Sequence, residues 1–277
     1  MVERDQVLMA ILGARALRAL AGGGRARRVD QAWCAFADAG HPAFDSIVVT
    51  ERCVEPRGLV RSLETALGAA EAYVYCGGDG HDRLIEELRS AGSGVLDDEP
   101  WMGLDSVDLH ARRDAEAESE AEDVVVGPIE GGPSMASAPD PDGLIVAPLD
   151  LAELGDARAL LSDVFEVEPA VLDRSLSDHV LAGPGAAVLG ASLDDELIGV
   201  VATQRVDEAI VITELAVVDP ARGHRVGSRL VGAVIGAALA DGLLLIAVQA
   251  APEAAGLYQR LGFDVSMWCR VLKLSGG

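Results

Sequence analysis

Aromatic residues are scarce in this chain of 277 residues: Phe, Trp and Tyr together make up 4%. The core must therefore be built from Ala, Val, Leu and Ile, and a hydrophobic content of 50% is enough for a soluble globular protein. No apolar run approaches the ~20 residues that a membrane-spanning helix needs. The first 20 residues carry charges inside their apolar stretch, so they predict an amphipathic helix rather than a secretory signal.

Cysteine is also scarce, and the net charge of the chain is negative. The four cysteines (Cys34, Cys53, Cys76 and Cys269) are far apart and form no CxxC pair, so we expect free thiols in a reducing cytoplasm and no metal site. The formal net charge of −23 would repel nucleic acid and anionic membranes, so neither is expected as a partner. The same charge is compatible with cationic substrates such as amines.

A change in composition divides the chain. Residues 111–142 are dense in Glu, Asp and Ala and then in Pro, Gly and Ser. This composition predicts a linker, with one short strand at Val124–Val126. We therefore expect one domain at residues 1–110 and another at residues 143–277. The first domain mixes helical spacing with short β-branched runs, which indicates an α/β unit.

Periodicity in the second domain predicts the order β-α-α-β-β-β-α-β-α-β-β, a mixed sheet flanked by helices. Its central feature is a near-continuous apolar strand at Ala209–Val218, as expected for a strand that is buried on both faces. Asp219 and Pro220 end this strand, and a short turn then opens directly into a helix at Val226–Ala240.

This turn is suited to bind phosphate. Backbone N–H groups in the first turn of a helix lack intrahelical partners, and the helix dipole adds partial positive charge there. Gly223 and Gly227 allow an anion to approach the backbone, and Arg222, His224 and Arg225 add positive charge. In so acidic a chain the cluster predicts an anion site; the alternative is a basic turn that serves only as a loop.

The segment Ile212–Leu239 resembles the acyl-CoA signature of the GNAT superfamily of N-acetyltransferases, in which [QR]-x-x-G-x-[GA] follows a strand at a helix start. Arg222 fits the first position of this signature and Gly227 the last. A second segment, Ala254–Phe263, resembles the closing motif of the family, where a helix carries a tyrosine and ends in Leu-Gly-Phe. The resemblance covers residues 143–277 and implies the α/β GNAT fold: a mixed central sheet with splayed strands, flanked by helices.

The resemblance also implies acetyl-CoA as co-substrate, with direct transfer of its acetyl group to a primary amine. Backbone groups of Leu215, Ala216 and Val217 would pair with the pantetheine arm and polarise the thioester carbonyl. The pyrophosphate would lie on the turn, at Arg222, Gly223, His224, Arg225, Val226, Gly227 and Ser228.

Two residues are the candidates for proton transfer. Tyr258 matches the family's tyrosine, which acts as general acid toward the leaving thiolate; the alternative is a core aromatic. Glu214 is the carboxylate within the apolar strand and the candidate base; the alternatives are exposure to solvent or an ion pair with arginine. Asp207 and Glu208 are weaker candidates for the base.

Two positions depart from the family pattern. Arg225 stands where the family usually has its first motif glycine: a negative φ would allow the side chain, whereas close contact of the backbone with phosphate would weaken binding. Ala251 stands where family members often have asparagine. These departures motivate a second hypothesis, a non-catalytic acyl-CoA-binding protein with a regulatory or scaffold role.

The first domain resembles the same family more weakly. Ala72–Asp105 is similar to the last third of a GNAT domain, but Pro56-Arg57-Gly58, the nearest phosphate turn, lacks the second glycine. We therefore expect a degenerate GNAT-like domain and hence two tandem domains; the alternative is an unrelated α/β domain. The acceptor stays open among a polyamine, an aminoglycoside, an amino-acid derivative and a protein N-terminus. Homodimer formation is compatible with the apolar helix surfaces.

Overall fold

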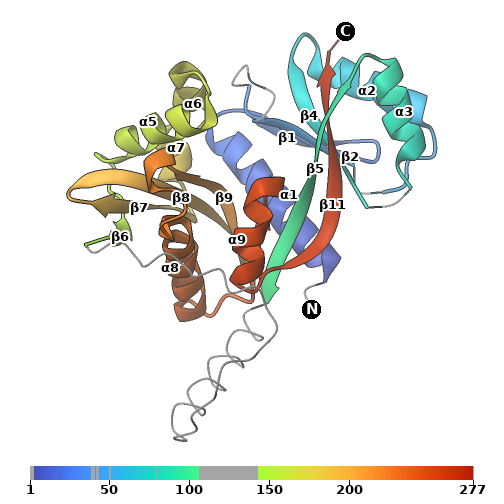
Figure 1. The fold of residues 1–277 in the computed structure, drawn as a ribbon. Coiled ribbons are helices and arrows are strands. Elements are labelled where there is room, and N and C mark those ends of the chain that lie inside the picture. The colour runs from blue at the N-terminus through green and yellow to red at the C-terminus, as the bar shows by residue number, and fades with distance from the viewer. Residues whose placement is uncertain are drawn as a thin grey trace, which may run out of the picture.

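The computed structural model describes residues 3–38, 41, 44–49, 51–78, 80–105 and 143–276. The predicted linker at residues 111–142 and its short strand lie outside these ranges. The described residues form one mixed sheet of eleven strands flanked by helices (Figure 1), in the order β1-β2-β3-β4-β11-β5-β10-β9-β8-β7-β6. The predicted fold class is therefore confirmed.

The elements before the linker alternate short strands with amphipathic helices. In chain order they are α1 (Arg4–Ala21), β1 (Arg25–Val29), β2 (Ala32–Phe36), β3 (Asp45–Val49), α2 (Pro56–Leu67), β4 (Glu71–Gly77), α3 (Asp82–Ser90) and β5 (Gly94–Asp105).

The elements after the linker form the longer strands and most of the helices. They are β6 (Ile145–Pro148), α5 (Leu154–Phe165), α6 (Pro169–Ser175), α7 (Asp178–Leu181), β7 (Ala186–Leu193), β8 (Glu196–Val206), β9 (Ala209–Val217), the 3₁₀ turn η1 (Asp219–Ala221), α8 (Val226–Ala240), β10 (Leu245–Gln249), the 3₁₀ turn η2 (Pro252–Ala254), α9 (Ala255–Arg260) and β11 (Asp264–Ser275).

The two parts of the chain exchange their last strands. Each part runs strand, helix, parallel strand, helix, strand: β3-α2-β4-α3-β5 and β9-α8-β10-α9-β11. The C-terminal strand β11 pairs antiparallel with β4 and with β5, and β5 pairs with β10 on its other side. The sheet is therefore continuous between the parts, and the division into two tandem domains stays a prediction.

Three local expectations differ from the structure. The predicted order has two helices between its first two strands, but the structure has three, because the chain leaves helical geometry at Leu176 (φ −123°) and Ser177 (ψ 164°), which separates α6 from α7. The two strands expected at the C-terminus are one strand, β11, with a register shift between Val265 and Met267. The hairpin β1–β2 is an addition: its first strand, Arg-Ala-Arg-Arg-Val, has the charged composition of a loop but pairs along its whole length with β2.

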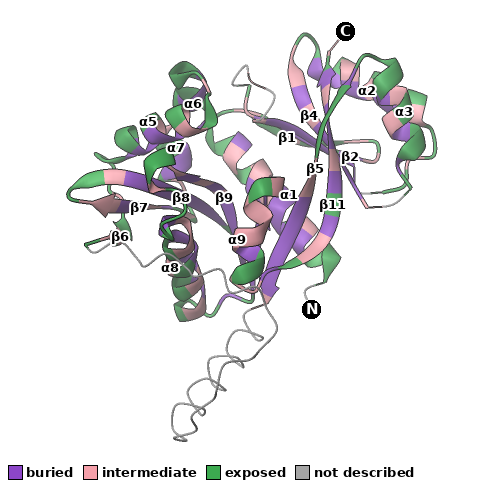
Figure 2. Ribbon diagram, viewed as in Figure 1, coloured by how far each residue is buried: buried purple, intermediate pink, exposed green. Residues whose placement is uncertain are grey.

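Helices cover both faces of the sheet, and strand β8 shows this residue by residue. Val201 packs in the cluster under α8 with Leu230, whereas the adjacent Val200 packs in the cluster under α5–α7 with Leu161. Successive side chains of a strand point to opposite faces, so β8 is buried on both sides. The middle of β8 is accordingly buried beneath the helices, whereas the edge strands β1 and β6 are largely exposed or half-buried (Figure 2).

Helix α1 joins the two parts of the molecule. It lies across the middle of the sheet (Figure 1), against β1 and β2 of one part and β8, β9 and β10 of the other. Its buried side chains Val7 and Ile11 share a cluster with Tyr75 of β4, Val211 of β9 and others. The first helix of the chain is therefore placed next to the middle of β9, about 200 residues later in sequence.

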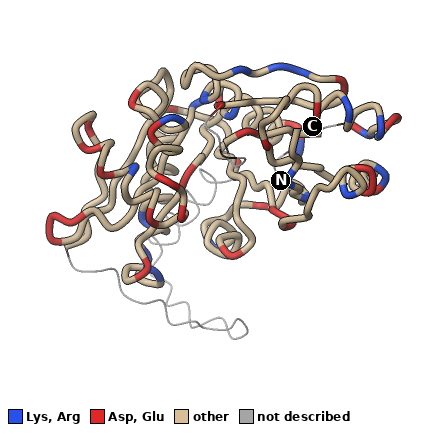
Figure 3. Tube along the Cα trace, turned by 90° about the horizontal axis from the view of Figure 1, so that it is seen from above, with Lys and Arg blue, Asp and Glu red and all other residues tan. Residues whose placement is uncertain are grey.

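The surface carries the charge that the composition implies. Acidic side chains are spread over loops and helix ends in both parts rather than gathered in one patch (Figure 3). Among the helices that the structure describes, none has the length and apolar character needed to cross a membrane.

Candidate active site

Strands β9 and β10 are paired over only part of their length. Their parallel register runs from Ala209–Leu245 to Ile212–Val248. Beyond Ile212, β9 continues to Val217, whereas β10 ends at Gln249. Within the described part of the chain, the second half of β9 has a strand partner on the β8 side alone. The two central strands therefore splay apart, as the resemblance to GNAT proteins implies.

The hydrogen bonds of β9 show which backbone groups face this opening. The Val218 N–H donates to the Ile198 carbonyl at 3.0 Å, beside β8. Backbone groups alternate in an antiparallel ladder, so those of Ala216 also face β8, and those of Leu215 and Val217 face the opening. The Val217 carbonyl accepts a hydrogen bond from Arg222 Nε at 3.0 Å. The N–H of Leu215, the N–H of Val217 and the carbonyl of Leu215 are therefore placed to pair with an extended ligand.

The first turn of α8 presents free donors near the end of β9. The Arg229 N–H bonds to the Arg225 carbonyl at 3.0 Å, the first such bond of this helix. No described residue accepts a hydrogen bond from the backbone N–H of Val226, Gly227 or Ser228. Three adjacent donors at a helix N-terminus form a site that favours phosphate.

The turn before α8 is held by its own side chains. Arg222 donates to the Val217 carbonyl and pairs with Asp219 at 2.7 Å, while His224 Nδ1 lies 3.0 Å from the Arg222 carbonyl. Gly223 has φ +78°, a conformation that favours glycine, and open space where a Cβ would stand. A Cβ on Gly227 would lie 3.4 Å from Leu257, so α9 packs directly beside this turn.

Arg225 adopts a left-handed conformation, with φ +62° and ψ 6°. The negative φ that would readily accept a side chain here is not observed. The position therefore retains the backbone geometry for which glycine is suited, and arginine stands there at a cost in strain. Its charge lies at the N-terminus of α8, where an anion would bind.

Replacing Arg225 with glycine is expected to stabilise the fold and to weaken anion binding. A left-handed φ costs a non-glycine residue about 1–2 kcal/mol, part of which is offset by the greater flexibility of glycine when unfolded. A net gain of about 1 kcal/mol would raise the Tm by roughly 2–4 °C. Loss of one cation at the helix end would raise the Kd for acetyl-CoA by about two- to fivefold. Thermal melts measure the Tm and calorimetry measures the Kd for acetyl-CoA. Arg225→Lys keeps the charge and the strain, so it should change neither value. An unchanged Tm for Arg225→Gly would contradict the backbone strain at Arg225.

Tyr258 lies in the core next to α8. It is 3% exposed, and its ring packs edge-on against Phe263 with the centroids 5.4 Å apart. It shares a cluster with Val248 and Ala250 at the end of β10 and with Val217 of β9. Burial raises the pKa of the phenol above its ordinary value, so the hydroxyl carries its proton at neutral pH. A buried, protonated phenol beside the splay fits either a proton donor or a core aromatic.

A β-bulge determines where Glu214 points. The register between β8 and β9 shifts there, so that Ala202 pairs with Glu214, Thr203 pairs with Ile212, and Thr213 is the extra residue. A bulge reverses the alternation of side chains that follow it. Glu214 consequently lies on the same face as Val211, toward α1, rather than on the face of α8.

Glu214 forms a buried ion pair with helix α1. Arg18 Nη1 lies 2.5 Å from Glu214 Oε1, and the two side chains are 16% and 8% exposed. The second atom of each group, Arg18 Nη2 and Glu214 Oε2, is buried without a hydrogen-bond partner. The sequence left two alternatives for Glu214, an ion pair with arginine and exposure to solvent. The structure shows the ion pair, and the side chain is not exposed. The other two candidate bases, Asp207 and Glu208, lie in the turn before β9 and are not brought together with Glu214.

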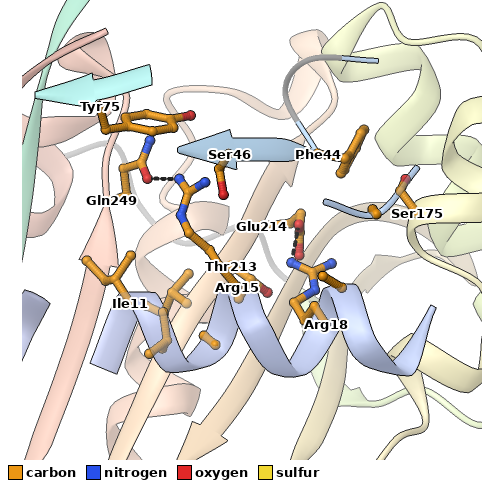
Figure 4. A pocket seen from close by; sticks show the side chains of 15 residues that line it. Ile11, Arg15, Arg18, Phe44, Ser46, Tyr75, Ser175, Thr213, Glu214 and Gln249 are labelled. Atoms are coloured by element: carbon orange, nitrogen blue, oxygen red, sulfur yellow. Dashed lines mark hydrogen bonds and ion pairs between the residues drawn. The ribbon is translucent and has the colours of Figure 1, made fainter. Parts of the chain in front are cut away.

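The ion pair lines a cavity of about 220 Å³ between α1 and the strands (Figure 4). Arg15, one turn before Arg18, also points into it: its guanidinium donates to Gln249 Oε1 and lies 4.4 Å from the centre of the Tyr75 ring. Gln249 in turn donates to Glu99 of β5. Burial raises the pKa of the Glu99 carboxyl, although the hydrogen bond from Gln249 and the nearby Arg15 act in the opposite direction.

The residues of α1 and Gln249 are a part of the site that the sequence analysis missed. One signal was available for Arg18: it continues the spacing of the buried Val7, Ile11 and Ala14, at intervals of four and three residues. An arginine on the buried stripe of an amphipathic helix requires a polar partner. Nothing local indicates that this partner is Glu214.

Comparison with known proteins agrees with this geometry. Residues 156–263 match the family described as Acetyltransferase (GNAT) family. This segment contains the splayed strand β9, the turn with free donors and α9. The chain therefore contains a GNAT acetyltransferase domain at these residues.

Solved structures share the fold over most of the chain. A GCN5-related N-acetyltransferase from Kribbella flavida matches with a TM-score of 0.59 at 15% identity, over 96% of each chain. A GCN5-related N-acetyltransferase from Sphaerobacter thermophilus matches with a TM-score of 0.56 at 15% identity, over 88% of this chain and 76% of that one. None of the curated proteins matches the sequence significantly. At these identities the likeness establishes the fold, and the site must establish the chemistry.

Proposed function

We propose that this protein transfers the acetyl group of acetyl-CoA directly to a primary amine. The observation that carries the proposal is the combination of a splayed strand and a helix end that offers three unpaired N–H groups. The pyrophosphate would bind at Val226, Gly227 and Ser228, with Arg225 adding charge. The pantetheine arm would pair with Leu215 and Val217 along the open edge of β9.

The chemistry requires two proton transfers around one attack. An ammonium acceptor first gives a proton to Glu214, and the nitrogen lone pair then attacks the thioester carbonyl carbon. The C–S bond breaks, and the second proton of the nitrogen passes by way of the proton donor to the thiolate, so that coenzyme A leaves as a thiol while Glu214 holds the first proton. Backbone N–H groups at the open edge of β9 would stabilise the oxyanion, a contribution that is large in acyl transfer. The products are the amide, the free thiol and one proton.

Acetyl-CoA binding and thiol release test this proposal together. Calorimetric titration of the full chain should show saturable binding, and a thiol-release assay with a panel of amines should show turnover above hydrolysis. Binding without turnover on any amine would favour the alternative, an acyl-CoA-binding protein with a regulatory or scaffold role. That alternative is motivated by Arg225 and by Ala251, which lacks a polar side chain. Absence of binding would reject both.

Tyr258→Phe tests the proposed proton donor. If the Tyr258 hydroxyl protonates the thiolate, the change should lower kcat by about 100-fold, the low end of the range for general acids. The Kd for acetyl-CoA should stay within about twofold, because the ring and its packing on Phe263 are preserved. Tyr73→Phe on β4 is the matched control. A kcat equal to the wild-type value would assign Tyr258 to core packing alone.

A further inference from the structure

The cavity beside Glu214 identifies a class of acceptor. The inference rests on the proposed function, because it takes this cavity as the place where the amine meets the acetyl group. Glu214 stands on β9 immediately before Leu215, so the cavity and the open edge of the strand share a boundary. An amine that contacts Glu214 is therefore close to a ligand that pairs with Leu215.

The buried ion pair leaves one donor and one acceptor unused. Arg18 and Glu214 share a single hydrogen bond, and the Arg18 Nη2 and Glu214 Oε2 atoms are buried without partners. Both residues line the cavity, and the close-up shows their side chains meeting inside it (Figure 4). Buried polar atoms without partners cost free energy, which a ligand that satisfies them recovers. The complement of this pair is a molecule with an anionic acceptor next to a cationic donor.

The charge of the cavity favours the same ligand. Its lining includes two guanidinium groups, from Arg15 and Arg18, and one carboxylate, from Glu214, while the Glu99 carboxyl lies outside the lining, behind Gln249. In the described part of the chain, no carboxylate lies within ion-pair distance of Arg15, which instead donates to the neutral amide of Gln249. This excess of positive charge stands in a chain whose net charge is −23. Arginine binds carboxylates through paired N–H donors, so the lining is suited to a carboxylate.

The size of the cavity limits the ligand further. Its volume of about 220 Å³ is below the ~300–1,000 Å³ of pockets that hold drug-sized ligands. An aminoglycoside could place only part of its structure inside this volume, and both it and a polyamine would bring further cations against Arg15 and Arg18. A protein N-terminus brings an amine without a carboxylate beside it.

We therefore propose that the acceptor is a small amino acid-like molecule, whose carboxylate binds Arg15 and Arg18 while its amine contacts Glu214. The carboxylate accepts from Arg18 Nη2, and the ammonium donates to Glu214 Oε2. The same contact that recognises the amine thus places it against the base. This differs from the cationic acceptor that the net charge of the chain by itself suggests.

Matched acceptors test the proposal. With the full chain saturated with acetyl-CoA, thiol release is measured for free L-amino acids, each beside its carboxamide and its decarboxylated amine. We expect the kcat/KM of at least one amino acid to exceed those of its carboxamide and its decarboxylated amine by about 100-fold, the equivalent of roughly 2.7 kcal/mol. Equal or faster turnover of the decarboxylated amines across the panel would overturn the proposal and leave acetyl transfer itself established.

Variants of the two arginines provide a second readout. Arg15→Met keeps most of the side chain's packing and removes its charge, so it should raise the KM for the amino acid by about 100-fold with little change in the Kd for acetyl-CoA. Arg18→Met would leave Glu214 buried without a counter-charge, so Arg18→Lys is used. Lysine keeps the ion pair and removes the Nη2 donor, and it should raise the KM for the amino acid about tenfold. Arg83→Met, on the exposed face of α3, is the control. Unchanged KM in both cavity variants would overturn the proposal.

Direct binding distinguishes a failure of the proposed function from a failure of the carboxylate site. If acetyl-CoA fails to bind, or no acceptor is acetylated, the proposed function fails. Calorimetric titration of the amino-acid panel into the chain then tests the carboxylate site by itself. Binding that is lost in Arg15→Met would support the carboxylate site, and absence of binding to the wild-type chain would overturn it.

Discussion

Replacing Gly227 with glutamate is expected to abolish measurable acetyl-CoA binding, with Kd raised at least about 100-fold, or roughly 2.7 kcal/mol. Gly227 contributes one of the three unpaired N–H groups in the first turn of α8. A carboxylate there would occupy the position of the pyrophosphate and repel it. The fold itself should accept the change, because the nearest atom to a Cβ at this position is Leu257 Cδ2 at 3.4 Å.

The matched control is Gly236→Glu on the same helix. Gly236 is exposed, has open space where a Cβ would stand, and lies more than two turns beyond the phosphate site. It adds the same charge to the same helix, so its Kd should stay within about threefold of the wild-type value. Calorimetry of both variants, after thermal melts have shown that they are folded, makes the comparison. Equal Kd values for Gly227→Glu and wild type would place the cofactor elsewhere.

Replacing Glu214 with glutamine should lower kcat by about 100-fold or more, with little effect on the Kd for acetyl-CoA. General bases contribute about 10²–10⁴-fold to rate, and glutamine cannot take the proton of an ammonium acceptor. The side chain lies on the α1 face of β9, away from the turn that binds pyrophosphate.

Stability must be measured beside the rate for this variant. Glutamine still offers an oxygen to Arg18 Nη1, but the guanidinium charge loses its buried counter-charge, so Tm should fall. Rates are therefore expressed per folded molecule, at a temperature well below the lower Tm. Glu208→Gln, in the exposed turn before β9, is the matched control and should retain the wild-type kcat. A wild-type kcat in folded Glu214→Gln would remove Glu214 from the mechanism.

The phosphate turn was predictable because its signals are local. An apolar strand, the Asp219-Pro220 step and the first glycines of a helix follow one another within about twenty residues, and the observed helix α8 has the predicted bounds, Val226–Ala240. Only its detail was open: both signs of φ at Arg225 were compatible with the sequence, and the structure has the left-handed one. Backbone strain of this kind depends on how strand and helix are joined in three dimensions.

The acceptor cavity was not predictable in the same way. Arg18 and Glu214 are separated by 196 positions and meet because α1 lies across the middle of the sheet. The face on which Glu214 lies depends on one extra residue, Thr213, whose bulge reverses the alternation of the strand. Neither the packing of α1 nor the bulge leaves a pattern in the residues around Glu214.

The sequence by itself determined the class of fold and the position of the α8 turn, since hydrophobic period and turn chemistry act between near neighbours. The choice of Tyr258 as proton donor came from the resemblance to GNAT proteins. Tertiary structure alone decided that β5 and β11 are exchanged between the two parts of the sheet, that Glu214 faces α1, and that Arg15 and Arg18 reach it. These contacts join residues far apart in the chain. They are selected by the burial of whole faces against one another, which no local stretch of sequence specifies.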